Sequence, residues 1–368
     1  MPGKIDASLN EKLKNIQWGE YRIGDLFHKK TIKGIPKSEE NLIENPKGYH
    51  VFGQNIYYQY PQKVLNDDKY LTQVEPGKPI IAYTSSTAQI GIISESFYRT
   101  GDNGAFQGLF PKFEQCNYNQ ILFILVAIKR KFIGLGYNDS MAHVMDLYIK
   151  LPVCDGKIDF TYMDSFVDEL KAQQVDKLKA YLSITGLDNY ELTSDEKMAL
   201  SNFGNVTWSK FNLKDLYGLS TRGKRLKSMD RINGELPFVT AGEANEGVSA
   251  FIGNKVDIFS KNTITIDMFG SAKFRNYKYG ADDHIAVVHT EELSKLSAIF
   301  VTTAIHKSSY TGQFSYSRNF YAKDADELNI QLPVKDNDID NHYMDVLISA
   351  IHKLVIKEVV LYVKYKRV

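Results

Sequence analysis

The chain is poor in cysteine and contains no long apolar run. Its two cysteines, Cys116 and Cys154, offer neither a disulfide framework nor metal-ligand spacing, which is the usage expected of a cytoplasmic protein. The longest apolar run, Ile121 to Ile128, covers eight residues, whereas a transmembrane helix needs about 20. The N-terminus also lacks the basic and then apolar pattern of a secretory signal. We therefore expect a cytoplasmic protein without a membrane partner.

Neither sign of charge is in excess. The sequence contains 45 Lys and Arg residues against 44 Asp and Glu residues, for a formal net charge of +1. A protein that binds nucleic acid through its overall charge would be strongly basic, so any such function has to reside in local patches. Hydrophobic residues make up 43% of the chain and charged residues 24%, as in ordinary globular proteins, and the length of 368 residues predicts two domains.

Sequence motifs of catalysis are also missing. There is no Asn-Pro-Pro-aromatic or Asp-Pro-Pro-aromatic motif of the kind that amino-methyltransferases use, and no glycine-rich phosphate loop. Glu169 and Lys171 have the spacing found in many nucleases, but they fall on a predicted helix, where a solvated helix face explains them. His143 and His284 are interpreted as isolated histidines, without a cysteine or carboxylate at ligand spacing. The sequence thus predicts neither a catalytic nor a metal site.

What the sequence does contain is an internal repeat of half its length. The stretch from Ile149 to Leu182 recurs as Ile330 to Val363, and the same offset relates the prolines of the two Leu-Pro-Val segments (333 minus 152 is 181). Further upstream, Trp18 opens the motif Trp-x-x-Tyr-x-Ile-x-Asp-Leu-Phe, and Trp208 opens a matching one at a slightly larger offset (208 minus 18 is 190). Matching ends around interiors of different length indicate a common frame that holds two divergent interiors.

Each copy of the repeat is predicted to end in a strand followed by a long helix. Pro152 and Pro333 are expected to end the strand, because proline lacks the amide that a ladder needs. Asp159 and Asp340 then offer N-caps, and apolar residues recur at spacings of three and four over about three heptads. Such a helix of about 24 residues is a rod of roughly 36 Å. We predict that the two rods pair with each other; alternatively, each is a core helix of its own domain.

The segments between the repeated ends read as a mixture of strands and helices. Strand patterns occur at 79–83, 91–93, 263–266 and 285–288, and helix patterns at 121–130 and 296–306. The predicted fold class is α+β, with two similar domains joined by two long helices that form an antiparallel coiled coil with pseudo-two-fold symmetry. The first domain covers 1–158 and the first long helix 159–185. A connector and the second domain cover 186–337, and the second long helix 338–368.

A cationic loop follows the Trp motif in each half. The members expected to contact a nucleic acid are Lys29, Lys30, Lys33 and Lys37 in the first half, and Arg222, Lys224, Arg225 and Lys227 in the second. Cationic loops at matched places on a two-fold frame suit a duplex, whose phosphates also repeat. The alternative for either loop is a solvated lysine loop without a ligand.

Polar side chains with hydrogen-bonding capacity lie near the predicted strand ends. The candidates for reading base edges are Gln54, Asn55, Ser85, Ser86, Thr87 and Gln89 in the first half, and Asn245, Lys273, Arg275, Asn276 and Arg318 in the second. Arginine pairs with guanine and asparagine or glutamine with adenine in bidentate fashion. The alternative is that these residues only form turns. Because the two sets differ, the halves are expected to read different sequences.

Taken in this order, the doubled elements resemble the specificity (S) subunit of type I restriction–modification enzymes. The resemblance rests on the Trp motifs, on Arg222-Gly223-Lys224, on the Leu-Pro exits and on the long helices, and it covers nearly the whole chain. It implies two target-recognition domains, at 18–153 and 208–334, each docked in the major groove on one half of a split DNA site. The first domain departs from the pattern, because it has Lys30-Thr31-Ile32-Lys33-Gly34 where the second has Arg-Gly-Lys.

The resemblance also implies the partners. The paired helices would set the gap in the site and hold methyltransferase (M) subunits, and restriction (R) subunits would join through the complex. The chain would direct them to double-stranded DNA without catalysis or a cofactor of its own, whereas the partner subunits would use S-adenosylmethionine, ATP and Mg. Three alternatives stay open: the recognition subunit of a type IIB-like enzyme, a nuclease with an unrecognised active site, and a repeat scaffold that binds only protein.

Overall fold

The computed structural model describes residues 6–53, 56–57, 59–101, 105–114, 116–133 and 141–365. Contacts divide the chain into two compact units, 1–178 and 179–366, and the boundary falls within one long helix. Within the described part of the chain, no helix is both long enough and apolar enough to cross a bilayer.

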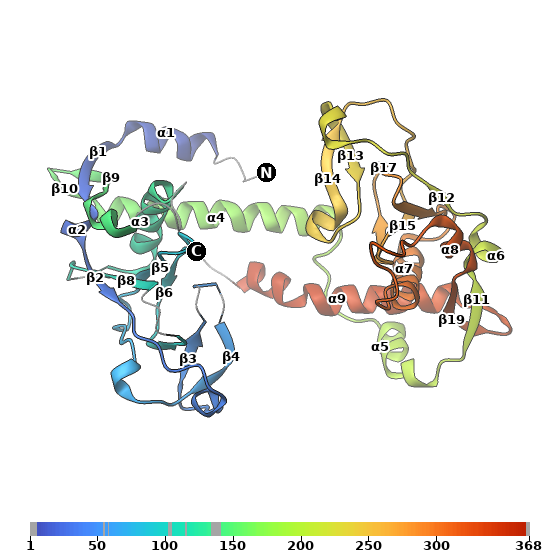
Figure 1. The fold of residues 1–368 in the computed structure, drawn as a ribbon, viewed down its shortest axis with the longest axis horizontal. Helices are drawn as coiled ribbons and strands as arrows, with labels where there is room; N and C mark the ends of the chain where they lie inside the picture. The colour runs from blue at the N-terminus through green and yellow to red at the C-terminus, as the bar shows by residue number, and fades with distance from the viewer. Residues whose placement is uncertain are drawn as a thin grey trace. The chain divides into compact units, whose positions relative to one another are not determined.

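The first unit combines three small sheets with two substantial helices (Figure 1). Its helices are α1 (Ala7–Asn15), α2 (Ile23–Leu26), α3 (Tyr118–Lys131) and α4 (Phe160–Ile184). Its strands are β1 (Gln17–Arg22), β2 (Phe27–Thr31), β3 (Tyr49–Phe52), β4 (Gln59–Val64), β5 (Ile80–Thr84), β6 (Ile90–Ile93), β7 (Phe97–Arg99), β8 (Phe106–Pro111), β9 (Tyr148–Cys154) and β10 (Lys157–Ile158).

The second unit has the same number of strands and one more helix among its described residues. Its helices are α5 (Ser194–Ser201), α6 (Leu213–Tyr217), α7 (Lys295–Ser309), α8 (Ala322–Glu327) and α9 (Asn341–Tyr365). Its strands are β11 (Trp208–Asn212), β12 (Thr221–Arg222), β13 (Asn233–Val239), β14 (Val248–Ile252), β15 (Thr263–Asp267), β16 (Ala272–Arg275), β17 (Gly280–Ala281), β18 (Ile285–Val288), β19 (Asn329–Lys335) and β20 (Asp338–Ile339). The predicted α+β class and both long helices are confirmed.

The strand orders of the two units correspond sheet by sheet. The order β1-β9-β10 matches β11-β19-β20, the order β2-β8-β5-β6 matches β12-β18-β15-β16, and the order β4-β3-β7 matches β14-β13-β17. In the last pair of sheets, the central strand (β3 or β13) is antiparallel to β4 or β14 and parallel to β7 or β17. The duplication inferred from the ends of the repeat therefore extends through interiors whose sequences differ.

The prediction that Pro152 and Pro333 end their strands is wrong. Strand β9 runs through Pro152, which lies opposite Trp18, and β19 runs through Pro333, which lies opposite Trp208. Each proline carbonyl accepts a hydrogen bond from the amide of the residue just before the long helix, at 2.9 Å for both Asp159 and Asp340. Proline is tolerated in a strand where its missing amide is not needed for the ladder, and its carbonyl here fixes the turn into the helix.

Each long helix begins inside the core of its own unit. The N-caps predicted at Asp159 and Asp340 are confirmed, because each carboxylate accepts the amide of the tyrosine three residues on, at 2.8 Å. Met163 and Met344, one turn later, are both fully buried in the main core clusters. Burial of a side chain of this size stabilises a fold by about 1.5–3 kcal/mol. The start of each long helix is therefore part of the core of its own unit.

A short helix precedes each Trp motif and packs on the long helix of the same unit. Lys12 of α1 pairs with Glu169 of α4, and Gln173 of α4 donates a hydrogen bond to Ser8. In the second unit α5, whose N-cap Thr193 forms a capping box with Glu196, packs on α9. Glu196 of α5 there receives Lys353 of α9 at 2.8 Å. Helices α1 and α5 are thus the same element of the repeat.

Candidate nucleic-acid interface

Each cationic loop is built around a glycine that lies against neighbouring backbone. A Cβ atom on Gly34 would be 1.9 Å from the carbonyl oxygen of Gly101, and one on Gly223 would be 1.9 Å from that of Ala281. The next residue then donates its amide to the same segment, Ile35 to Arg99 at 2.8 Å and Lys224 to Ala281 at 3.0 Å. The first loop therefore has the construction of the second, although it lacks the Arg-Gly-Lys run.

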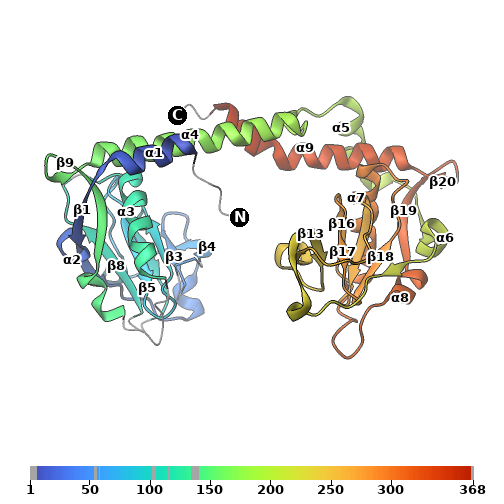
Figure 2. The ribbon, with the colours of Figure 1, turned by 90° about the horizontal axis from the view of Figure 1, so that it is seen from above.

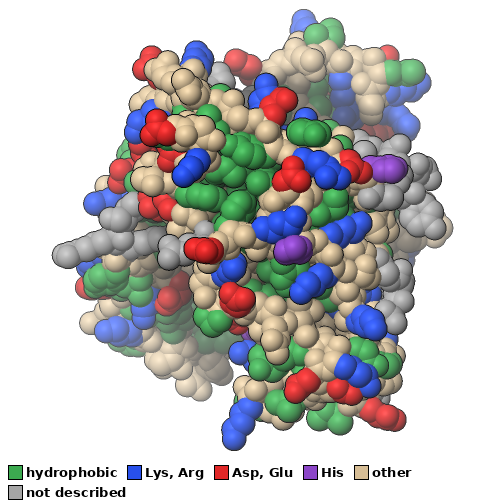
Figure 3. Space-filling model, turned by 90° about the vertical axis from the view of Figure 1, so that its left-hand side faces the viewer, with side chains coloured by type: hydrophobic (Ala, Val, Ile, Leu, Met, Phe, Trp, Pro, Cys, Tyr) green, Lys and Arg blue, Asp and Glu red, His purple; other side chains and the backbone are tan. Residues whose placement is uncertain are grey.

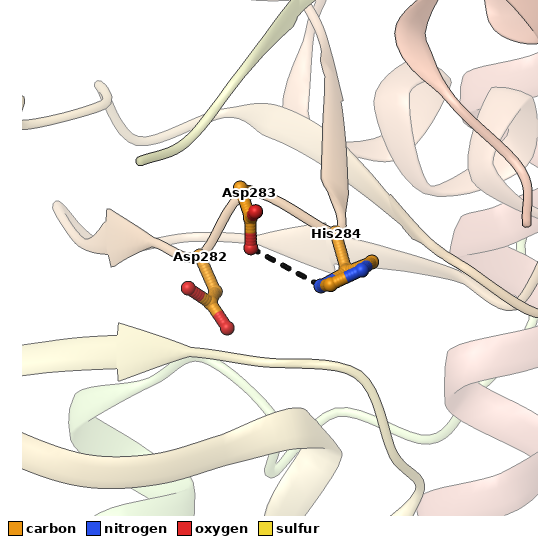
Figure 4. Close-up of side chains that lie close together, drawn as sticks. All are labelled: Asp282, Asp283 and His284. Atoms are coloured by element: carbon orange, nitrogen blue, oxygen red, sulfur yellow. Dashed lines mark ion pairs between the residues drawn. The ribbon is translucent and has the colours of Figure 1, made fainter. Parts of the chain in front are cut away.

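An acidic turn, residues 282–284 between β17 and β18, supports the second loop. The carboxylate of Asp282 accepts the amide of Leu226 at 3.2 Å, which fixes the loop between Arg225 and Lys227. Asp283 pairs with His284 at 3.1 Å, and all three side chains lie close together between β17 and β18 (Figure 4). The interpretation of His284 as a histidine without carboxylate neighbours is therefore wrong. Asp282 is occupied in supporting the loop, so we assign this turn a structural role.

The cationic side chains predicted for the two loops face solvent, although Lys29 and Lys30 lie on strand β2 and Arg222 lies on strand β12. All eight predicted members are exposed, namely Lys29, Lys30, Lys33, Lys37, Arg222, Lys224, Arg225 and Lys227. Two have partners: Lys224 pairs with Asp257 at 3.0 Å, and Lys30 lies 4.6 Å from the ring centre of Phe110. Figure 3 shows one face of the protein, on which Lys and Arg side chains are interspersed with acidic and apolar ones. The positive charge is therefore local, as the net charge of +1 requires.

The polar candidates of the first unit gather in the turn that joins β5 to β6. Thr87 is exposed and its hydroxyl lies 2.7 Å from that of Thr84, while Ser86 and Gln89 are half-buried. Ser85 donates its amide and hydroxyl to the carbonyl of Ala105, at 2.8 and 3.2 Å, and so ties the turn to the start of β8. Gln54 and Asn55, also predicted to read bases, lie outside the described residues.

The turn that joins β15 to β16 is the counterpart in the second unit. Asp267 is only 3% exposed, and its carboxylate accepts the amides of Phe269 and Ser271 at 2.9 and 3.0 Å. Lys273 is held half-buried beside it by Ser271 at 2.9 Å and by Glu243 at 3.1 Å. A hydrogen bond with Ser271 and the nearby Lys273 hold the pKa of Glu243 below its usual range, although partial burial opposes them. The carboxylate of Glu243 is exposed and favours its ionised form, and it extends from the β13–β14 turn to Lys273 beside the β15–β16 turn.

Arg275 was predicted to contact DNA, and the structure corrects this prediction. Its side chain is 1% exposed and donates to the hydroxyls of Thr265 at 2.9 Å and Tyr277 at 3.1 Å. A buried guanidinium bound to neighbouring strands supports the sheet and does not reach a base edge. The sequence could not reveal this, because an arginine on a short strand reads the same whichever face it occupies.

The remaining candidates of the second unit are exposed. Asn276 follows β16, and Asn245 occupies the β13–β14 turn with a positive φ of 49°, a conformation that asparagine tolerates well. Arg318 lies 5.4 Å from the ring centre of Phe314, in a loop that packs on the β15–β16 turn. Glu243 belongs to the same surface through its pairing with Lys273. It carried no signal in the sequence, because a single exposed turn residue has no periodicity.

The two matched surfaces agree with what comparison with known proteins shows. The sequence model of the type I restriction modification DNA specificity domain matches twice, over residues 15–180 and 205–361. Among characterised proteins, the chain is similar to the specificity subunit S.BcgI of a type II restriction enzyme from Heyndrickxia coagulans. The identity is 21% over 341 residues, covering 90% of this chain and 93% of that protein.

A solved structure has a similar fold over most of its length. The crystal structure of the S subunit of a type I restriction–modification system from M. genitalium matches with a TM-score of 0.56. The sequence identity is 14%, and the match covers 95% of this chain and 92% of that one. With two matches to one domain model that together span most of its length, this chain belongs to the family of type I restriction–modification DNA specificity proteins.

Proposed function

We propose that the protein is a non-catalytic specificity subunit that recognises a bipartite DNA site and directs methyltransferase and restriction subunits to it. Each unit would bind one half of the site, and α4 and α9 would lie antiparallel to set the gap between the halves. The observation that carries the proposal is one scaffold present twice, with a cationic loop at the same place and different polar side chains in the β5–β6 and β15–β16 turns.

The division of labour within each unit follows from the chemistry of DNA. Phosphate contacts fix position and orientation without carrying sequence information, which suits the exposed lysines and arginines of the loops. Base edges in the major groove are read by hydrogen bonds, which suits Ser86, Thr87 and Gln89 in one unit and Glu243, Lys273 and Asn276 in the other. Since these two sets differ, the two half-sites are expected to differ in sequence.

Partners and cofactors complete the proposal. The long helices would hold the M subunits, and the R subunits would join through the complex, in the cytoplasm. S-adenosylmethionine, ATP and Mg would be used by those partners, and this chain would carry none of them. The domain model and the M. genitalium fold favour a type I assembly, whereas the H. coagulans relative belongs to a type II enzyme. Reconstitution with the proteins of neighbouring genes separates the two, because a type IIB-like enzyme combines methylation and cleavage in one partner chain.

The loops can be tested by charge reversal in the assembled complex. Arg222→Glu together with Lys224→Glu should weaken DNA binding and reduce the slope of log K against log salt, by about 0.9 for each phosphate that is no longer bound. Lys210→Glu with Lys335→Glu, two exposed lysines on the β11-β19-β20 sheet, serves as the matched control. If the slope of log K against log salt is the same in both double variants, the loop does not contact DNA. That result would favour a scaffold that binds only protein.

The recognition role itself has a separate test. The methylome of the source organism should contain a split motif with an unspecified gap, and deletion of this gene should abolish modification at that motif. The purified chain incubated with DNA and magnesium should leave the DNA intact, because the role proposed here is recognition alone. Reproducible cleavage without partners would instead identify the protein as a nuclease.

A further inference from the structure

One helix in each unit spans the distance from the long helix to the polar turn. We call α3 and α7 the strut helices. Each lies against the sheet of its own unit (Figure 2), and α7 contacts β15, β16, β19 and α9. What holds the two ends of each strut decides how firmly the turn is placed relative to the rod.

The N-terminal end of α7 is bound by a carboxylate of the long helix. Asp345, in the first turns of α9, accepts the hydroxyl of Ser297 at 2.7 Å and also that of the N-cap Ser294. Ser297 is 1% exposed, so its hydrogen bond is shielded from water. Hydrogen bonds to an ionised acceptor are stronger and geometrically stricter than those between neutral groups.

The first unit has the same arrangement with other side chains. Asp164 of α4 accepts the amide groups of the N-cap Asn117 at 2.8 Å and of Gln120 at 2.6 Å. Asp164 and Asp345 are related by the offset of the repeat (345 minus 164 is 181). The carboxylate is therefore retained in both halves, while its partners have changed from two amides to two hydroxyls at the N-cap and the third helical position.

The C-terminal end of α7 holds the β15–β16 turn. Ser309 donates its hydroxyl to the carbonyl of Gly270 at 2.6 Å, and Ala272 donates its amide to Nδ1 of His306 at 3.2 Å. A Cβ atom on Gly270 would lie 2.3 Å from the carbonyl oxygen of Ser309, so the turn and the helix end touch. The strut of 15 residues is about 22 Å long and buries Val301 and Ile305 completely.

The far end of α3 packs on the end of β5, just before the β5–β6 turn. Phe132, the C-cap residue of α3, is buried. Its ring makes an edge-to-face contact with that of Tyr83, with centroids 5.3 Å apart. Tyr83 is the penultimate residue of β5, directly before Thr84 and the turn. In both units, then, one end of the strut is bound by a carboxylate on the long helix. The other end contacts the turn itself in the second unit and the strand that leads into the turn in the first.

We propose that Asp164 and Asp345 are positioning residues that, through the strut helices, fix each polar turn relative to its long helix. Because the rods would set the spacing of the half-sites, these carboxylates would govern how strictly the gap length is read, without touching DNA. This consequence rests on the proposed function, whereas the geometric part concerns each unit alone and is tested separately.

The geometric part is tested in the full chain without DNA. Cys116→Ala and Cys154→Ser remove the native thiols, and spin labels are placed at Val355 on α9 and at Asn276 after β16, both exposed. Asp345→Ala should broaden the label–label distance distribution at least twofold relative to the parent. Ser294→Ala with Ser297→Ala removes the same hydrogen bonds from the strut side and should do the same. Asp338→Ala, an exposed carboxylate of β20, is the control and should leave the distribution narrow.

The functional part uses the assembled complex and duplexes in which the gap of the methylome-derived site is varied by one base pair at a time. The parent should bind one gap length at least tenfold better than its neighbours, and Asp164→Ala with Asp345→Ala should reduce this preference severalfold while half-site sequence preference persists. Unbroadened distances in both unit-two variants, or an unchanged gap preference, would overturn the positioning role. If the parent binds no split site, the proposed function fails, and the distance measurements still decide the geometric claim.

Discussion

Single glycines determine where the cationic loops lie. Gly34 and Gly223 occupy positions at which any side chain would meet a carbonyl oxygen at 1.9 Å. A backbone that approaches this closely fixes the path of the loop on either side of the glycine. The requirement is steric, and so it applies equally to loops whose charged residues differ.

Gly223→Ala should therefore destabilise the second unit. The added methyl group forces the loop away from Ala281, and overpacking of this kind typically costs about 1–3 kcal/mol. Chemical denaturation followed by Trp208 fluorescence in a Trp18→Phe background reports on this unit. Gly204→Ala, where a Cβ would meet nothing within 4 Å, is the matched control and should have little effect. Equal stability of the two variants would contradict the close approach.

The two cysteines should differ sharply in reactivity. Burial, together with the nearby Asp164, raises the pKa of Cys116 to about 12, whereas Cys154 is exposed beside Asp155, whose charge also raises its pKa. A disulfide reagent at pH 8 should label one thiol per native chain, and label the second roughly 100-fold more slowly or only after unfolding. Two fast thiols in the native protein would show that the interior around Cys116 is open. Cys154→Ser is the control, and should leave no fast-reacting thiol.

Residue roles were the least predictable part of the protein. The exposure of the eight cationic residues follows from composition alone, because charged side chains in short polar segments remain in water. The burial of Arg275 and the contacts of Asp282 depend on which face of a short strand or turn each residue occupies. A four-residue strand gives too few positions for a pattern to settle that choice.

Among the elements, helix α5 is attached to α9 through a buried charged residue. Glu196 of α5 is 5% exposed and receives Ser349 at 2.6 Å, Lys353 at 2.8 Å and the Thr193 amide at 2.8 Å. Burial alone would raise the pKa of Glu196, but Lys353, Ser349 and Thr193 outweigh it and hold the pKa at about 2, against an ordinary 4.5. The carboxylate thus stabilises the folded state in its ionised form.

Glu196→Gln should lower the free energy of unfolding of the second unit by about 1–3 kcal/mol at pH 7, because a buried charged hydrogen-bond acceptor is lost. A depressed folded-state pKa contributes stability that is present above 4.5 and disappears as the pH falls toward 2. The difference between parent and variant should therefore shrink over that window. Trp208 fluorescence, next to Phe203 at the end of the connector, provides the readout.

Asp195→Asn serves as the control for this measurement. Asp195 neighbours Glu196 on α5 but is exposed, so its substitution should be nearly neutral at every pH. A Glu196→Gln variant whose deficit is the same at pH 3 and pH 7 would show that the ionised carboxylate is not the stabilising species.

The long helices could be predicted because their apolar pattern extends over many residues. The polar contacts that join them to neighbouring elements could not be predicted. Both long helices, their aspartate caps and the helices α3 and α7 follow from apolar spacing over many residues. The run of β9 and β19 through Pro152 and Pro333 did not, since proline usually marks a strand end. The contacts of Asp164 and Asp345 were hidden as well, because their partners are amides in one half and hydroxyls in the other.

At the scale of the whole molecule, one strand topology occurs twice in a single chain, in units whose polar turns differ. Under the proposed function, the shared scaffold would hold position and the differing turns would discriminate between half-sites. The constant offset between the two exits was visible in the sequence, and the correspondence of the interiors became visible only through strand pairing.

Insertion of one heptad into α4 and one into α9 should lengthen the gap of the recognised site. Seven helical residues add about 10 Å, close to three base-pair steps of about 3.4 Å. Methylation by the reconstituted complex on duplexes of graded gap length measures the shift. An insertion in α4 alone breaks the match of the two rods and should reduce methylation at every gap. An unchanged gap in the double insertion would exclude the helices as the spacer.

The attachment of the short helices has opposite polarity in the two halves. Lys12 approaches Glu169 in the first, and Glu196 approaches Lys353 in the second, on nearly the same stretch of the rod (169 plus 181 is 350). If the two short helices traded places, lysine would confront lysine and glutamate would confront glutamate. Because the two halves belong to one polypeptide, each short helix could pack on the wrong long helix during folding. The reversed charges make the pairing within each half the favourable one.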